Sequence, residues 1–114
     1  MSRHLGEFEQ LLMFALLELE TDAHGVTLRR AIADRTGRQV SPGAVYTAME
    51  RLESRGFVVS RVGDATPARG GRRRKYYDLE PEGAEALQRS YETLTRMADG
   101  LESRLSSLAS AASR

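Results

Sequence analysis

Five basic side chains crowd one short, glycine-containing stretch, and the chemistry they offer is neutralisation of an anion. Residues 69–75 contain no acidic residue. Held this close together, like charges repel one another, so the stretch is costly unless it meets an anion such as a phosphate backbone. The rest of the chain has 12 basic residues against 16 acidic ones, so any attraction for anions is local. The five residues are Arg69, Arg72, Arg73, Arg74 and Lys75.

A second set of polar side chains lies along an expected helix that begins at residue 41. Ser41 is a good N-cap, and Pro42 suits the first helical position. The positive end of the helix dipole favours phosphate, and small residues there let the helix approach a DNA backbone closely. Hydroxyl and guanidinium groups further along can donate to phosphate oxygens or to a guanine edge. We expect the exposed face to present Ser41, Gly43, Tyr46, Thr47, Glu50 and Arg51.

The residues that catalysis or metal binding would need are scarce. The chain has two histidines, His4 near one end and His24 in an expected turn, and it has no cysteine. Neither a G-x-S-x-G nucleophile motif nor a phosphate-binding G-x-x-x-x-G-K-[ST] loop occurs. We therefore expect no enzyme, no catalytic site, no metal site and no cofactor.

Three helices followed by two strands must position the basic stretch 69–75 and the polar side chains of the helix that begins at residue 41. Apolar spacing and turn residues predict helices over about 7–20, 26–35 and from 41 to Gly56, and strands over 57–62 and 75–79. This order is typical of a winged helix-turn-helix, in which the third helix enters the DNA major groove. The two strands and their basic loop form the wing. We predict a mostly helical α+β fold, with this DNA-binding domain over residues 1–80.

The inward-facing positions of the second and third helices follow from their spacing. In the second helix, Val26, Leu28 and Ile32 are expected to face inward, and Gly37 ends the helix. In the third helix the expected buried stripe is Val45, Ala48, Met49 and Leu52.

The first and last helices carry more apolar surface than one small domain can cover. The first helix is apolar on every side, which predicts that a second subunit covers part of it. From Pro81 onward, apolar residues recur every three or four positions over more than three heptads, as in a coiled-coil seam. We assign residues 81–108 to one long C-terminal dimerisation helix, bent or frayed near Gly100, and 109–114 to a flexible tail. The stripe is Ala84, Leu87, Tyr91, Leu94, Ala98, Leu101, Leu105 and Leu108.

Three stretches resemble the PadR family of bacterial transcriptional regulators, specifically its short subgroup with a single C-terminal helix. They are residues 5–10 (LGEFEQ), residues 41–53 (SPGAVYTAMERLE) and the wing sequence 66–77 (TPARGGRRRKYY). The resemblance extends over about residues 5–90, and the wing stretch is its most specific part. By position, it implies DNA contacts from Ser41, Gly43, Tyr46, Thr47, Arg51, Arg69, Arg72, Arg73 and Lys75; the charge run adds Arg74.

The resemblance also implies a homodimer built by the first and last helices, which represses a promoter and is released by a small molecule. Two features depart from the family pattern. His24 stands where many relatives have a tyrosine, and the chain has no tryptophan, so the aromatic drug-stacking platform of some relatives is missing. The effector of those relatives therefore cannot be transferred to this chain.

The apolar space between two subunits is the expected site of a small hydrophobic effector, although the same residues also suit a plain dimer core. The residues assigned to this interface are Phe8, Leu12, Leu16, Leu87, Tyr91, Leu94 and Leu101. We predict that the protein is a sequence-specific transcriptional regulator whose partners are double-stranded operator DNA and a second copy of the chain.

Two other functions remain open. The heptad stripe would also serve a protein-interaction module that recruits a different partner. The single Arg69-Gly70-Gly71 beside two tyrosines would suit RNA or single-strand binding, although binders of that type use repeated boxes or aromatic platforms. The longest apolar run, residues 11–17, is shorter than the roughly 20 residues of a membrane span. We expect a cytoplasmic protein with no membrane partner.

Overall fold

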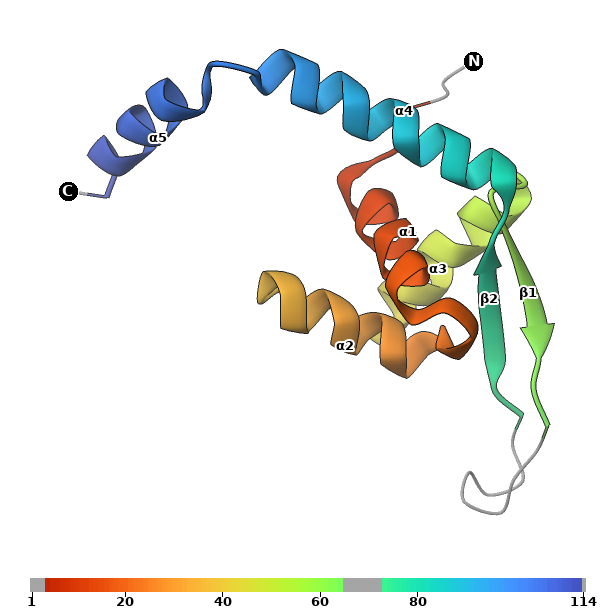
Figure 1. Ribbon diagram of the computed structural model, residues 1–114. Coiled ribbons are helices and arrows are strands. Elements are labelled where there is room, and N and C mark those ends of the chain that lie inside the picture. The colour runs from red at the N-terminus through yellow and green to blue at the C-terminus, as the bar shows by residue number, and fades with distance from the viewer. Residues whose placement is uncertain (1–3, 65–72, 114) are drawn as a thin grey trace.

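The computed structural model describes residues 4–64 and 73–113, and it places three helices, a hairpin and a long fourth helix around one core (Figure 1). This order confirms the predicted winged helix-turn-helix, a mostly helical fold with a small antiparallel sheet. The elements are α1 (Glu7–Leu19), the 3-10 turn η1 (Glu20–Asp22), α2 (Gly25–Thr36), α3 (Pro42–Ser54), β1 (Val58–Val62), β2 (Lys75–Leu79), α4 (Pro81–Ala98) and α5 (Glu102–Ala111).

The ends of α2 and α3 are set by the residues that the sequence indicated. The Ser41 hydroxyl accepts a hydrogen bond from the backbone N–H of Ala44 at 3.1 Å, which satisfies one of the free donors at the start of α3. Gly37 follows α2 with φ 76°, and Gly56 follows α3 with φ 78°. A side chain at either position would be strained, because positive φ is a region that glycine occupies without a steric penalty.

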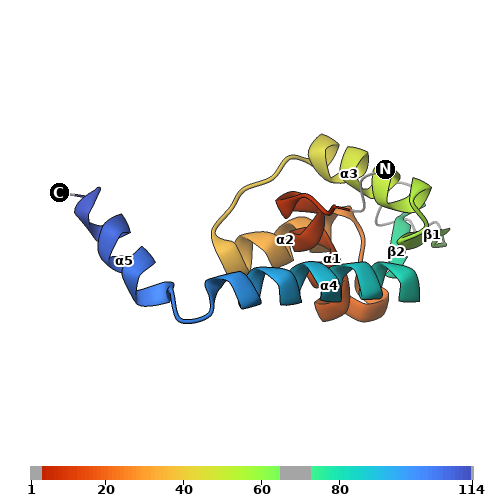
Figure 2. The ribbon, with the colours of Figure 1, turned by 90° about the horizontal axis from the view of Figure 1, so that it is seen from above.

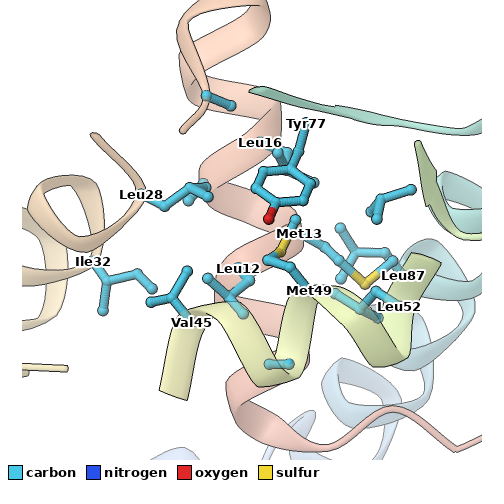
Figure 3. Packing of buried hydrophobic residues seen from close by; sticks show 14 of the residues in the cluster. Leu12, Met13, Leu16, Leu28, Ile32, Val45, Met49, Leu52, Tyr77 and Leu87 are labelled. Atoms are coloured by element: carbon cyan, nitrogen blue, oxygen red, sulfur yellow. The ribbon is translucent and has the colours of Figure 1, made fainter. Parts of the chain in front are cut away.

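The core lies where α1 meets the other helices and the inner face of the hairpin. Figure 3 shows α1 at its centre, with side chains of α2, α3, β2 and α4 converging on it. Removing these side chains from water is the main favourable contribution to the fold. The labelled core residues are Leu12, Met13, Leu16, Leu28, Ile32, Val45, Met49, Leu52, Tyr77 and Leu87.

One inward-facing assignment in α2 is wrong. Leu28 and Ile32 are buried as predicted, but Val26 is 48% exposed. It precedes Leu28 by two residues, and residues two apart point to opposite sides of a helix, so Val26 lies on the face away from the buried Leu28, Ala31 and Ile32.

The hairpin is antiparallel and is fixed to the turn between α1 and α2. Val58 pairs with Leu79 at one end and Val62 with Lys75 at the other. His24 in the turn forms an isolated bridge with Tyr76, and the Arg61 guanidinium lies 4.7 Å above the Tyr76 ring. The same guanidinium donates to the backbone oxygen of Thr21 at 2.8 Å. These contacts hold the wing in a defined direction relative to the helices.

The C-terminal region consists of two helices instead of the single predicted one. α4 ends at Ala98, and Gly100, with φ 80°, breaks the path before α5 begins at Glu102. The expectation of one continuous helix over 81–108 is therefore wrong, although the expected bend lies at Gly100 as predicted, and α5 extends to Ala111, into the segment assigned to a flexible tail. Figures 1 and 2 show α5 beyond the end of α4, away from the other helices.

Candidate nucleic-acid interface

The outer face of α3 carries the polar side chains that the sequence analysis placed there. Because Val45, Ala48, Met49 and Leu52 are buried, the opposite side of the helix is left to solvent. The side chain of Tyr46 is 51% exposed. The other predicted contact residues of this helix are all exposed: Ser41, Gly43, Thr47 and Arg51.

The basic end of the wing lies beside this face. The Lys75 ammonium is 5.8 Å from the centroid of the Tyr46 ring on α3 and equally far from that of Tyr77. Just before Lys75, Arg73 is exposed and Arg74 is half-buried. The backbone oxygen of Arg74 accepts from the N–H of Gly63 at 2.7 Å, which continues the hairpin past its last strand pair. Arg69 and Arg72 lie outside the described residues.

Two carboxylates also belong to this site, although neither was assigned a role from the sequence. The Tyr46 hydroxyl donates to Glu50, and this hydrogen bond, together with the charge of Glu50, raises the pKa of Tyr46. Glu53 accepts from the Ser60 hydroxyl at 2.7 Å, which links α3 to β1. The i, i+4 spacing of Tyr46 and Glu50 was the available signal, since residues four apart meet on one face of a helix.

Two tyrosines of this site, Tyr46 and Tyr77, are expected to ionise at a higher pH than an ordinary tyrosine. Burial, followed by the charge of Glu53, raises the pKa of Tyr77, while Glu50 raises that of Tyr46. A raised pKa in the folded chain contributes stability that is present below the ordinary value of 10.0 and is lost as pH rises through the raised value. We expect absorbance at 295 nm to show two of the four tyrosines ionising late. Glu50→Gln should move one of them back, and an unchanged curve would contradict the Tyr46–Glu50 pair.

His24 has a structural place in the turn before α2. It is only 4% exposed, and its ring meets Tyr76 edge-on with centroids 5.3 Å apart. Its Nε2 lies 3.7 Å from the Asp22 carboxylate. Among residues 4–64 and 73–113, no group of three or more His, Cys, Asp or Glu side chains could hold a metal ion. No helix within these ranges combines the length and the apolar character that crossing a membrane requires.

Comparison with known proteins identifies the family. Residues 13–89 match the family model described as the transcriptional regulator PadR-like family. The chain belongs to the PadR family. This match covers the second half of α1, the helix-turn-helix, the wing and the first half of α4, and it excludes α5.

Relatives agree with this assignment to a family of transcriptional regulators. The transcriptional regulator Rv3488 of Mycobacterium tuberculosis is 37% identical over 81 residues, which are 69% of each chain. A PadR family regulator from Eggerthella lenta is 30% identical, with a TM-score of 0.68 over 87% of this chain and 86% of its own. One from Clostridium difficile is 24% identical, with a TM-score of 0.69 over 86% and 98%. This PadR protein is a transcriptional regulator and not an enzyme.

The predicted dimer interface divides into two groups in the PadR chain. Leu12, Leu16 and Leu87 are at most 3% exposed, so they belong to the core of the single chain and assigning them to an interface is wrong. Heptad spacing reports burial but does not distinguish a neighbouring helix of the same chain from one of a second chain. Phe8 is half-buried against the core. The exposed members of the predicted set are Tyr91, Leu94 and Leu101.

The exposed apolar surface of α1 meets that of α4 at one aromatic contact. Phe14 and Tyr91 pack edge-to-face with centroids 6.0 Å apart, yet they are 42% and 54% exposed. Leu17 extends this surface on α1, and Met97 extends it on α4. Leu101, Leu105 and Leu108 continue it across the break, since they line one hollow with Leu94, Met97 and Ala98.

A larger hollow lies between the start of the chain and α4. It measures about 570 Å³, within the usual range of small-molecule sites. Of the residues predicted to line an effector site, Leu94 lines this hollow, whereas Phe8, Leu12 and Leu16 do not. The expected effector site therefore differs from this hollow. The lining of the hollow mixes polar and apolar side chains: His4, Gln10, Ala86, Arg89, Ser90, Thr93, Leu94 and Met97.

Proposed function

We propose that this PadR regulator binds double-stranded DNA as a homodimer, with α3 in the major groove and the wing on the flanking backbone. The observation that carries the proposal is the juxtaposition of Lys75 on the wing with Tyr46 on α3. It gives one continuous surface on which the helix can reach bases while the wing reaches phosphates. Two such surfaces roughly 34 Å apart, one DNA turn, would read a near-palindromic operator.

Tyr46, Thr47 and Arg51 are proposed to contact DNA from α3, together with Ser41 and Gly43 at its start. These five are exposed, and three of them, Ser41, Gly43 and Tyr46, lie at the N-cap or in the first part of α3, at the positive end of its dipole. Arg73, Arg74 and Lys75 are the described wing residues of the proposal, and Arg69 and Arg72 join them from the sequence alone.

We further propose that the bound dimer represses its promoter and that a small hydrophobic effector releases it. The 570 Å³ hollow beside α4 supports an effector, because it adjoins the apolar surface on which a second subunit would pack. A ligand there would change the spacing of the two α3 helices and hence the affinity for DNA.

The exposed apolar surface of α1, α4 and α5 supports the homodimer. Contiguous apolar surface of this kind marks interaction sites in soluble proteins. Acidic and basic residues alternate beside the stripe, as Glu85, Arg89, Glu92 and Arg96 show, which suits pairing with an antiparallel copy of the same helix. A heteromeric partner, as in the interaction-module alternative, would use the same stripe.

Replacing Leu105 with glutamate is expected to weaken the dimer. Leu105 is 69% exposed in the single chain, and burying a leucine contributes about 1.5–3 kcal/mol, twice over in a symmetric pair. Light scattering coupled to size exclusion should show a dissociation constant at least tenfold higher, which is the effect of about 1.4 kcal/mol. Ser106→Glu, which adds the same charge to the neighbouring exposed residue, is the control. Equal effects of the two variants would contradict a role for this stripe.

The proposed function is tested by titrating the protein against its own upstream DNA at two salt concentrations with excess non-specific duplex. Salt-sensitive binding that survives the competitor would support a sequence-specific regulator. Binding that the competitor abolishes would refute it and favour partner recruitment through the apolar stripe.

A further inference from the structure

Glu50 places a negative charge on the surface that is proposed to meet DNA. It is exposed on the outer side of α3, one turn after Tyr46, whose hydroxyl it accepts. Lys75 lies near the same tyrosine from the wing side. A shallow hollow on this face is lined by Thr47, Glu50, Arg51, Glu53 and Ser54, so the carboxylate lies in a concavity of the surface.

A carboxylate in this position has few favourable partners on a duplex. It repels phosphate, and like charges brought together across an interface are strongly unfavourable. It only accepts hydrogen bonds, and in the major groove the only donors are the amino groups of cytosine and adenine. Adenine sets its N7 acceptor beside that amino group, which suits the amide of Asn or Gln better than a carboxylate. Cytosine N4 is therefore the matching group.

The hydrogen bond from Tyr46 leaves Glu50 able to make such a contact. A carboxylate offers roughly four acceptor positions, so Glu50 can interact with the Tyr46 hydroxyl and still accept from a second donor. Glu53 differs, because the Ser60 hydroxyl holds its carboxylate toward the wing at 2.7 Å.

We propose that Glu50 is a specificity-determining residue that accepts a hydrogen bond from the N4 amino group of a cytosine in each half-site of the operator. This inference rests on the proposed binding of α3 in the major groove. The same carboxylate lowers the affinity for all other sequences, because every wrong register brings it toward a base acceptor or a phosphate. Glu50 thereby gives up some affinity for any DNA in exchange for discrimination.

The test selects bound sequences from a randomised duplex library with the wild-type protein and with Glu50→Ala, Glu50→Gln and Glu53→Gln. Wild-type protein should enrich cytosine at one position of each half-site, by roughly 10- to 100-fold over other bases. Glu50→Ala should lose that preference and bind non-specific duplex more tightly. Glu50→Gln should move the preference toward adenine, whose N6 and N7 pair with an amide. Glu53→Gln should leave the selected sequence unchanged.

The outcomes separate this inference from the proposed function. A wild-type protein that selects no sequence would overturn both. A wild-type protein that selects an operator, while Glu50→Ala retains the same cytosine, would overturn the role of Glu50 alone. Loss of binding to every duplex by both Glu50 variants, with an unchanged far-ultraviolet spectrum, would show that Glu50 only positions Tyr46 and would also overturn the inference.

Discussion

Replacing Arg73 and Arg74 together with alanine is expected to flatten the salt dependence of DNA binding. A dimer loses four charges beside the Lys75 end of the wing. If each wing neutralises two or three phosphates, the wings alone give a log–log slope of about −4 to −5. Removing four contacts should reduce the slope by about 3 to 4, which is roughly a thousandfold in affinity between 1 M and 0.15 M salt. Fluorescence anisotropy at four salt concentrations measures this.

The same substitution separates the wing from bulk charge when it is set beside a matched control. Arg96→Ala with Arg104→Ala removes the same charge from α4 and α5, and this pair should leave the slope unchanged. Adding Arg72→Ala, in the segment outside the described residues, should flatten the slope further for all sequences alike. If the control pair changes the slope as much as the wing pair, the wing has no special role in binding.

Replacing Gly83 with alanine is expected to destabilise the fold strongly. Gly83 is buried in the first turn of α4, and a Cβ there would lie 2.2 Å from the backbone oxygen of Phe57 and 2.9 Å from its carbon. That oxygen already accepts from the N–H of Glu80 at 2.9 Å, so the start of α4 cannot move away without losing a hydrogen bond. We expect a loss of about 3 kcal/mol, the upper end of the usual range for overpacking.

Gly25→Ala provides the control for this prediction. Gly25 begins α2, is exposed, and has no atom within 4 Å of the place where its Cβ would lie. Its replacement should change the free energy of unfolding by less than about 0.5 kcal/mol. Urea denaturation followed by circular dichroism at 222 nm measures both variants at one protein concentration, because dimerisation would add to the apparent stability. Equal midpoints would refute the close approach of the start of α4 to the backbone of Phe57.

Local signals in the sequence predicted most of the fold. The cap at Ser41, the left-handed glycines 37 and 56, and the strand at 75–79 each depend on a few neighbouring residues, so they were available before any tertiary contact was known. Val26 was assigned wrongly although it stands only two residues before Leu28, a spacing that places the two side chains on opposite sides of a helix.

The remaining differences depend on information that a single sequence does not contain. Leu12, Leu16 and Leu87 were assigned to an interface because their pattern is the same whether the neighbour is intramolecular or intermolecular. The stripe from Leu94 to Leu108 continues in register through Gly100, so the apolar pattern predicted one helix; Gly100 itself indicated a bend, but not that the helix ends and a second one begins. Glu50 and Glu53 were left without roles because their partners, Tyr46 and Ser60, had to be placed first.

The left-handed backbone at Gly100 has a consequence for how this protein can change over evolutionary time. The direction of α5 depends on a single residue whose φ of 80° is strained for any residue with a side chain. One substitution there could straighten α4 and α5 into one helix. That would alter the geometry of the proposed dimer and leave every residue of α3 and the wing unchanged. Because the family match ends at residue 89, the segment that follows can diverge among paralogues that share the same DNA-binding domain. Related proteins could thus change how their subunits associate and still recognise the same operator sequence.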